Sequence, residues 1–181
     1  MKLRLSLILL VLAAAAWAQG LRDLSQSQER VTAGPAGPVR VRAGSAAKVE
    51  LPFRVAPGFH INSNQPKSDL LIPTLVHLDP PTDILVGKVE YPAGKDVSFS
   101  FAPTEKLNVY QGDFAVTALV SAARRTSPGR YRVRGALKYQ ACDDRACYPP
   151  TSVPVAFDVQ VLKALSTRTR HNPAQSPHIH R

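Results

Sequence analysis

The feature that most constrains the fold is a regular alternation of apolar and polar residues. It is clearest in "GRYRVRGALKYQAC", residues 129–142. Successive side chains of a β-strand point to opposite faces, so this pattern predicts strands with one face in a core and the other in water. Four other stretches alternate in the same way: "KVELPFRV" (48–55), "DVSFSF" (96–101), "DFAVTALV" (113–120) and "VPVAFDVQV" (153–161).

These patterns predict an all-β protein, an immunoglobulin-like antiparallel β-sandwich with flexible N- and C-terminal tails. The 16 prolines and 10 glycines punctuate the strands, and roughly seven to nine short strands fit such a sandwich. A small β-barrel is the alternative. Pro154 places the last strand at a sheet edge, because proline cannot donate to the ladder. The apolar positions expected in the core are Val49, Leu51, Phe53, Val55, Val97, Phe99, Phe101, Phe114, Val116, Ala118, Val120, Tyr131, Val133, Leu137, Tyr139, Ala141, Val153, Val155, Phe157, Val159 and Val161.

The flanks of this region carry different signals. Residues 1–18 combine a basic start, a short apolar run and an Ala-Trp-Ala tripeptide, which predicts a cleavable signal peptide and export. We expect residues 19–37 to be a flexible leader and residues 166–181 a disordered basic tail. The domain should then span residues 38–165 and should not be embedded in a membrane.

The chain carries a formal net charge of +10. Such an excess can indicate nucleic-acid binding. Here, however, basic residues alternate along a strand at Arg130, Arg132 and Arg134, and no basic helix is visible. We therefore expect no nucleic-acid partner; for an exported chain, a solvated basic surface or an anionic partner in the cell envelope fits the charge better. We also expect a monomer.

The two cysteines, Cys142 and Cys147, lie in "YQACDDRACYPP" (139–150) with four residues between them. An extended chain would separate their Cα atoms by about 17 Å, whereas a disulfide needs roughly 4.4 to 6.8 Å. A bridge therefore requires the chain to turn back at "DDRA", which places the pair at a β-hairpin. If the alternation continues unbroken, Cys142 lies on the polar face.

Three interpretations of this pair remain open from the residues alone. A structural hairpin staple would stabilise the fold by only about 2 kcal/mol, because the ring is small. An accessible bridge in an oxidising compartment could exchange with partner thiols. A metal site would need further ligands, such as His60 and His77, which no pattern places nearby.

The segment "YQACDDRACYPP" resembles the active-site segment of the amino-terminal periplasmic domain of the thiol:disulfide interchange protein DsbD family, which typically shows "YQGC…CYPP". The similarity extends to "PGFHINSNQP" (57–66), "YPAG" (91–94), "VSFSF" (97–101) and "VYQGDFAVTALV" (109–120), in the order of the family. It covers about residues 38 to 163 and implies an immunoglobulin-like fold.

The resemblance also implies roles for single residues. Cys142 and Cys147 would be the redox pair, and Cys147 would form the mixed disulfides. An aromatic cap loop shields the pair in the family, so Phe99 and Phe101 are candidates for this cap, although their alternation fits core positions equally well. Tyr148, beside Cys147, is a further candidate for shielding the pair.

This sequence departs from the family pattern in three respects. The cysteine spacing is one residue shorter than in the best-known member. His60 and Asn62 replace its paired tyrosines, and His60 is both a shielding candidate and a possible aid to proton transfer. No transmembrane or thioredoxin-like part is present, so we expect a stand-alone version.

The predicted function is periplasmic thiol-disulfide interchange without a bound cofactor, because the dithiol itself is the carrier. The electron donor would be the thioredoxin-like domain of a membrane reductase, and the acceptors would be oxidised periplasmic thiol proteins. A non-catalytic exported binding module with a structural hairpin disulfide is the main alternative. A metal-handling protein is the third.

Overall fold

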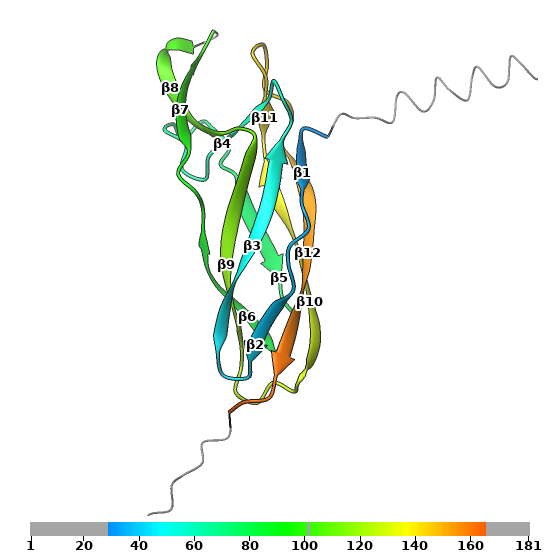
Figure 1. Ribbon diagram of the computed structural model, residues 1–181. Coiled ribbons are helices and arrows are strands. Elements are labelled where there is room, and N and C mark those ends of the chain that lie inside the picture. Colours follow the sequence, from blue (N-terminus) through cyan, green and yellow to red (C-terminus); the bar gives the residue numbers. More distant parts are fainter. Residues whose placement is uncertain (1–28, 101, 166–181) are drawn as a thin grey trace, which may run out of the picture.

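The computed structural model describes residues 29–100 and 102–165, and these residues form twelve β-strands (Figure 1). No stretch of these residues forms a helix long and apolar enough to cross a membrane. The predicted signal peptide and C-terminal tail lie outside the described residues. The strands are β1 (Val31–Ala33), β2 (Val39–Arg42), β3 (Ala46–Val55), β4 (His60–Asn62), β5 (Leu75–Asp79), β6 (Ile84–Glu90), β7 (Lys95–Phe99), β8 (Ala102–Tyr110), β9 (Asp113–Ala122), β10 (Gly129–Tyr139), β11 (Ala141–Cys142) and β12 (Thr151–Leu162).

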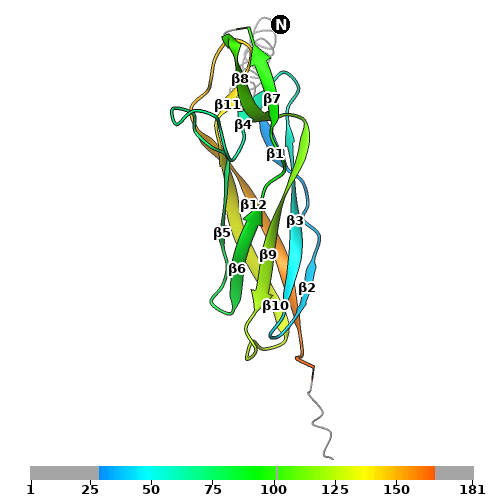
Figure 2. The same ribbon diagram turned by 90° about the vertical axis from the view of Figure 1, so that its left-hand side faces the viewer.

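Two four-stranded sheets form the body of the molecule, and the predicted sandwich is confirmed (Figures 1 and 2). One sheet has the order β1-β3-β9-β6, and the other has the order β2-β12-β10-β5. Their long antiparallel pairs set the register, with Leu51 opposite Val116 and Val133 opposite Phe157. All pairings are antiparallel except that of β2 with β12.

The core lies between these two sheets, and the alternation of the sequence predicts it well. Leu137, Val116 and Val159 are fully buried, whereas the basic residues of β10 face outward. Gly135 falls on the inward side of β10, where a Cβ atom would lie only 2.1 Å from the backbone oxygen of His77. A side chain there would push β5 away from β10.

Two boundary predictions need correction. Val31–Ala33 was expected in the flexible leader, but it pairs with β3 as strand β1, and Val31 is 2% exposed. The last strand is not at an edge along its whole length, because its end, Val159–Leu162, pairs with β2. Pro154 nevertheless lies in the part of β12 that pairs only with β10, so its missing N–H removes no ladder bond on the open side.

A third sheet, β11-β4-β8-β7, extends one end of the sandwich and carries the cysteine hairpin (Figure 2). Stacked aromatic rings connect it to the body: Tyr110 lies on Phe114 at 4.7 Å, and Phe114 lies on Phe53 at 5.4 Å between ring centroids. Val97 and Phe99, expected in the core, are only half-buried in this small sheet. Phe101 lies outside the described residues.

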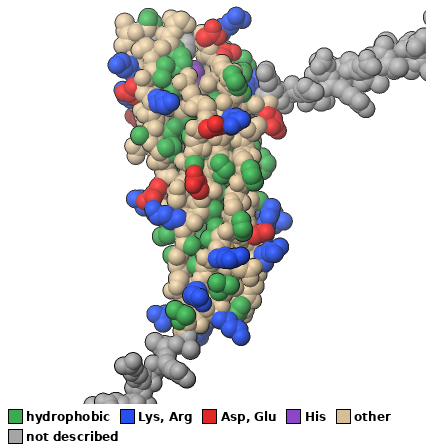
Figure 3. Space-filling model, viewed as in Figure 1, with side chains coloured by type: hydrophobic (Ala, Val, Ile, Leu, Met, Phe, Trp, Pro, Cys, Tyr) green, Lys and Arg blue, Asp and Glu red, His purple; other side chains and the backbone are tan. Residues whose placement is uncertain are grey.

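Charged side chains are unevenly distributed along the molecule. On the face seen in Figure 3, acidic and basic side chains are mixed in the upper half, and basic side chains predominate at the lower end. The cysteine hairpin lies at the upper end in the same view (Figures 1 and 3). The electrostatic environment of the cysteines is therefore set by individual neighbours rather than by the basic excess of the chain.

Candidate functional site

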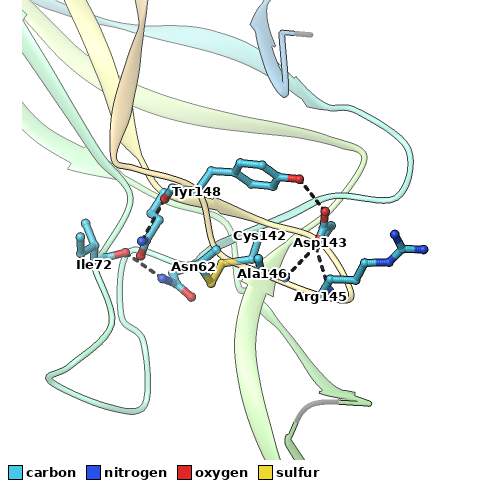
Figure 4. Close-up of a disulfide and its surroundings, with 9 residues drawn as sticks. Asn62, Ile72, Cys142, Asp143, Arg145, Ala146 and Tyr148 are labelled. Carbon is cyan, nitrogen blue, oxygen red and sulfur yellow. Dashed lines mark hydrogen bonds between the residues drawn. A yellow bond between two sulfur atoms is a disulfide. The ribbon is translucent and has the colours of Figure 1, made fainter. Parts of the chain in front are cut away.

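The cysteine hairpin, residues 141–148, closes on a disulfide between Cys142 and Cys147 (Figure 4). Their Cα atoms lie 4.0 Å apart, and the two residues form an isolated antiparallel bridge. The turn between them is closed by Asp143 N donating to Ala146 O at 3.0 Å, and Tyr148 N donates to Ala141 O at 2.8 Å. The predicted reversal of the chain at "DDRA" is confirmed.

The two sulfur-bearing residues differ strongly in exposure. Cys142 is 2% exposed, whereas Cys147 is exposed. The prediction that Cys142 lies on the polar face is wrong. Gln140 interrupts the strand between β10 and β11, and Ala141 and Cys142 are both buried where β11 pairs with β4. Gln140 Nε2 instead donates to Tyr148 O at 3.1 Å across the hairpin. Another molecule can thus approach the bridge from the side of Cys147.

Asp143 organises the turn with its carboxylate (Figure 4). Its Oδ1 accepts from the backbone N–H groups of Arg145 and Ala146, each at 2.8 Å, and its Oδ2 accepts from the Tyr148 hydroxyl at 2.7 Å. The hydrogen bond from Tyr148, followed by the two backbone bonds, lowers the pKa of Asp143 to about 2. The carboxylate is therefore ionised at neutral pH and disfavours a thiolate on the adjacent cysteine.

Tyr148 also takes part in a cation–π contact that the sequence did not suggest. The guanidinium of Arg30 lies 3.6 Å from the centroid of the Tyr148 ring and 5.7 Å from that of Phe59. Arg30 directly precedes β1 and fell within the predicted leader, so its position beside the hairpin was missed. Because the Tyr148 hydroxyl donates to Asp143, the contact between Arg30 and the Tyr148 ring helps to hold the turn in place.

His60 lies opposite the buried cysteine in the third sheet. It is the Cα partner of Cys142 in the antiparallel pair of β4 with β11, which places the two side chains on the same face. The imidazole is 2% exposed and stacks on Phe99 at 3.9 Å between ring centroids. Burial lowers the pKa of His60 below 6.5, and the negative charge of Asp143 opposes this shift in part.

The strand that carries His60 is held by buried polar contacts. Asn62 Nδ2 donates to Ile72 O at 3.0 Å (Figure 4), and Thr74 Oγ1 donates to the backbone oxygen of Asn62 at 2.6 Å. Ser63 N donates to Asn108 O at 2.9 Å on strand β8. These bonds fix β4 between the hairpin and β8, and hence fix the position of His60.

The residues that are candidates for shielding the cysteine pair differ in where they lie. Phe99, at the end of β7, is half-buried and covers the face of His60, so it lies over the site rather than in the sandwich core. Phe101 lies outside the described residues and stays a prediction. Tyr148 flanks the turn through Asp143. The shielding role of all these residues remains a proposal.

The interpretation of the cysteine pair as part of a metal site has little structural support. His60 does lie beside Cys142, contrary to our expectation that nothing places it nearby. His77 is on β5 and pairs with Asp79 at 2.9 Å on the surface. Within the described part of the chain, no group of three or more His, Cys, Asp or Glu residues is arranged to hold a metal ion.

Comparison with known structures finds similar β-domains. The N-terminal domain of DsbD from Neisseria meningitidis in its reduced form is 23% identical, with a TM-score of 0.40 over 62% of this chain and 75% of that chain. The same domain in its complex with the PilB N-terminal domain is also 23% identical, with a TM-score of 0.39 over 61% and 73%. The N-terminal periplasmic domain of ScsB from Proteus mirabilis is 13% identical, with a TM-score of 0.49 over 72% and 47%.

Comparison with protein families identifies the family of this chain. No curated protein matches the chain significantly. The sequence profile of one family, described as "Thiol:disulfide interchange protein DsbD, N-terminal", matches residues 27–158. This range begins close to β1 and includes both cysteines, His60 and Phe99. The chain therefore belongs to the family of N-terminal domains of the thiol:disulfide interchange protein DsbD.

Proposed function

We propose that this protein exchanges thiols and disulfides in the periplasm through Cys142 and Cys147. The difference in exposure of the two cysteines, within a hairpin of a family devoted to this exchange, carries the proposal. Electrons would come from the thioredoxin-like domain of a membrane reductase and pass to oxidised periplasmic thiol proteins. The dithiol is the electron carrier, so the relay needs no bound cofactor.

The order of events follows from the accessibility of the sulfurs. A donor thiolate attacks Sγ of Cys147, and Cys142 leaves as a thiolate that takes up a proton. The donor's second thiol then displaces Cys147 from the mixed disulfide, which leaves the pair reduced. In the next half-cycle Cys147 attacks an oxidised partner, and Cys142 resolves that mixed disulfide by attacking Cys147.

The negative charge of Asp143 beside the cysteine pair affects how readily the reduced pair reacts with disulfides. Asp143 is ionised and accepts three hydrogen bonds, and Arg145 lies 3.9 Å from Asp144. A negative charge next to Cys142 raises the free energy of a thiolate there. The reduced pair should therefore react slowly with unselected disulfides and faster with partners that bring cationic or hydrogen-bonding groups to the hairpin.

Single-cysteine variants test the assigned order. Cys142→Ser leaves the exposed Cys147 free to form a mixed disulfide with a thioredoxin-like protein that lacks its own resolving cysteine. Cys147→Ser leaves only the buried Cys142, which should trap far less. The measurement is the yield of mixed disulfide on a non-reducing gel, and equal yields from both variants would reject the order.

The reduction potential separates exchange from a structural staple. A relay has to cycle with thioredoxin-like proteins, so its potential should lie at roughly −200 to −270 mV. Equilibration with glutathione and dithiothreitol buffers, followed by counting free thiols, measures it. A potential well below about −300 mV would indicate a structural disulfide and contradict the proposed relay.

A further inference from the structure

His60 has a buried ring nitrogen that nothing in the oxidised site uses. Its Nε2 is inaccessible and has no hydrogen-bond partner among the described residues. The side chain lies opposite Cys142 in the β4–β11 ladder, where cross-strand Cβ atoms are about 4.5 to 5.5 Å apart. Phe99 covers one face of the ring at 3.9 Å. The imidazole is therefore held beside the buried sulfur with one polar atom unsatisfied.

An unsatisfied buried polar atom destabilises a fold, so its presence at a redox-active pair calls for an explanation. In the disulfide state neither sulfur carries a proton, and Cys142 offers nothing for Nε2 to accept. Reduction places a thiol on Cys142, which is a donor on the same face of the sheet. The nitrogen that lacks a partner in the oxidised state would acquire one in the reduced state.

Resting on the proposed exchange reaction, we propose that His60 is the general base that deprotonates Cys142 when Cys142 resolves a mixed disulfide. The proton of the Cys142 thiol passes to Nε2 of His60, and the sulfur's electron pair forms the bond to Sγ of Cys147. The bond between Cys147 and the partner sulfur breaks, and the partner leaves as a thiolate with that electron pair. The two cysteines are oxidised, the partner disulfide is reduced, and His60 returns its proton to water.

The surroundings of His60 suit this task. Burial keeps the imidazole neutral at neutral pH, so that it can accept a proton. The group whose charge reaches it is the carboxylate of Asp143 in the hairpin, which stabilises the imidazolium once it forms. Phe99 from β7 stacks on the ring, and β8 pairs with β4 at Ile61 and Asn62 rather than at His60. The hairpin and β4 thus bring together a thiol, an imidazole and a carboxylate that can act in sequence.

The test separates the two chemical steps with oxidised glutathione as the probe. The reduced protein is mixed with excess oxidised glutathione, quenched with acid and followed by mass spectrometry. In the Cys142→Ser background, His60→Gln should leave the rate of mixed-disulfide formation at Cys147 unchanged. With both cysteines present, His60→Gln should slow the release of glutathione from the mixed disulfide by roughly 100-fold or more.

The dependence of release on pH distinguishes a base from a structural residue. For the wild type, the release rate should rise with pH and level off once His60 is neutral, below pH 6.5. For His60→Gln, it should keep rising by about tenfold per pH unit toward the ordinary thiol pKa near 8.5. The exposed His77, changed to Gln, is the matched control and should behave like the wild type.

The outcomes separate this inference from the exchange function itself. Mixed-disulfide formation together with unchanged release in His60→Gln would overturn the role of His60 and leave the exchange function standing. A wild-type release rate that rises without a bend from pH 5 to 8 would overturn it as well, and this measurement needs no variant to fold. Failure of the wild type to form any mixed disulfide would overturn both.

Discussion

The body of the sandwich and its disulfide end bury different kinds of side chain. In the body, strands such as β9 and β12 alternate between buried apolar residues and residues that are half-buried or exposed. At the disulfide end, all three residues of β4 are buried, and two of them, His60 and Asn62, are polar. Four of the five buried polar residues described lie at this end: His60, Asn62, Ser63 and Thr74.

This difference shows how one domain separates stability from chemistry. The stabilisation that comes from burial of apolar surface in the body is non-directional. It should therefore persist when the disulfide at the other end of the molecule opens or closes. The disulfide end depends on hydrogen bonds and stacked rings that place single atoms, at the cost of burying polar groups. Opening the bridge should therefore change the site without removing the interactions that hold the two sheets together.

The largest effect should come from a cavity in the body. Leu137 is fully buried on β10, between β12 and β5. Leu137→Ala should lower the free energy of unfolding by about 2 to 5 kcal/mol. Urea unfolding followed by circular dichroism measures this loss. Leu119 is partly exposed, so Leu119→Ala is the control and should cause a smaller loss of stability. Equal losses from both variants would contradict the assignment of the core.

Reduction of the disulfide should have a smaller effect on stability. The ring spans six residues, and the loop-entropy relation gives about 2 kcal/mol for such a ring. The reduced protein should still unfold cooperatively, with a similar dependence on denaturant and an earlier midpoint. Loss of the cooperative transition on reduction would show that the bridge holds the body together, which would favour the binding module with a structural disulfide.

A single buried hydrogen bond at the disulfide end should contribute less to the free energy of unfolding than the disulfide does. Thr74 is fully buried, and its hydroxyl donates to Asn62 O at 2.6 Å. Thr74→Val keeps the shape but removes this bond, so we expect a loss of about 1 kcal/mol. The exposed Thr104→Val serves as the control. A faster exchange of the amide hydrogens of β4 in Thr74→Val, compared with those of β9, would localise the effect to the disulfide end.

The smallest effect concerns the response of stability to pH. Because burial lowers the pKa of His60, the folded protein binds fewer protons than the unfolded chain just below pH 6.5. The contribution of neutral His60 to stability is therefore complete above pH 6.5 and is lost as the pH falls from there toward the lowered pKa. Denaturant midpoints at pH 7.5 and 5.5 should differ more in the wild type than in His60→Gln. An equal difference in the two proteins would contradict the burial of His60.

Much of the body could be predicted from the sequence, because the period of two residues reports directly which side chains face a core. The strands around Leu51, Val116, Val133 and Phe157 lie as that pattern indicates. The strand at Val31–Ala33 was missed because three residues are too short to show a period. The position of Phe99 was open because the same alternation fits a sandwich core and a small sheet at its end.

At the site, the sequence by itself determined the cysteine pair and the reversal of the chain, because two cysteines with four residues between them can bridge only across a turn. It could not determine which sulfur is buried, since Cys142 is covered only because β11 pairs with the distant strand β4. Nor could it bring Arg30 and His60 to the hairpin, since both come from segments more than 80 residues earlier in the chain. Tertiary structure decided these points, because contacts between distant segments depend on how the strands pair and on what each pairing excludes from water.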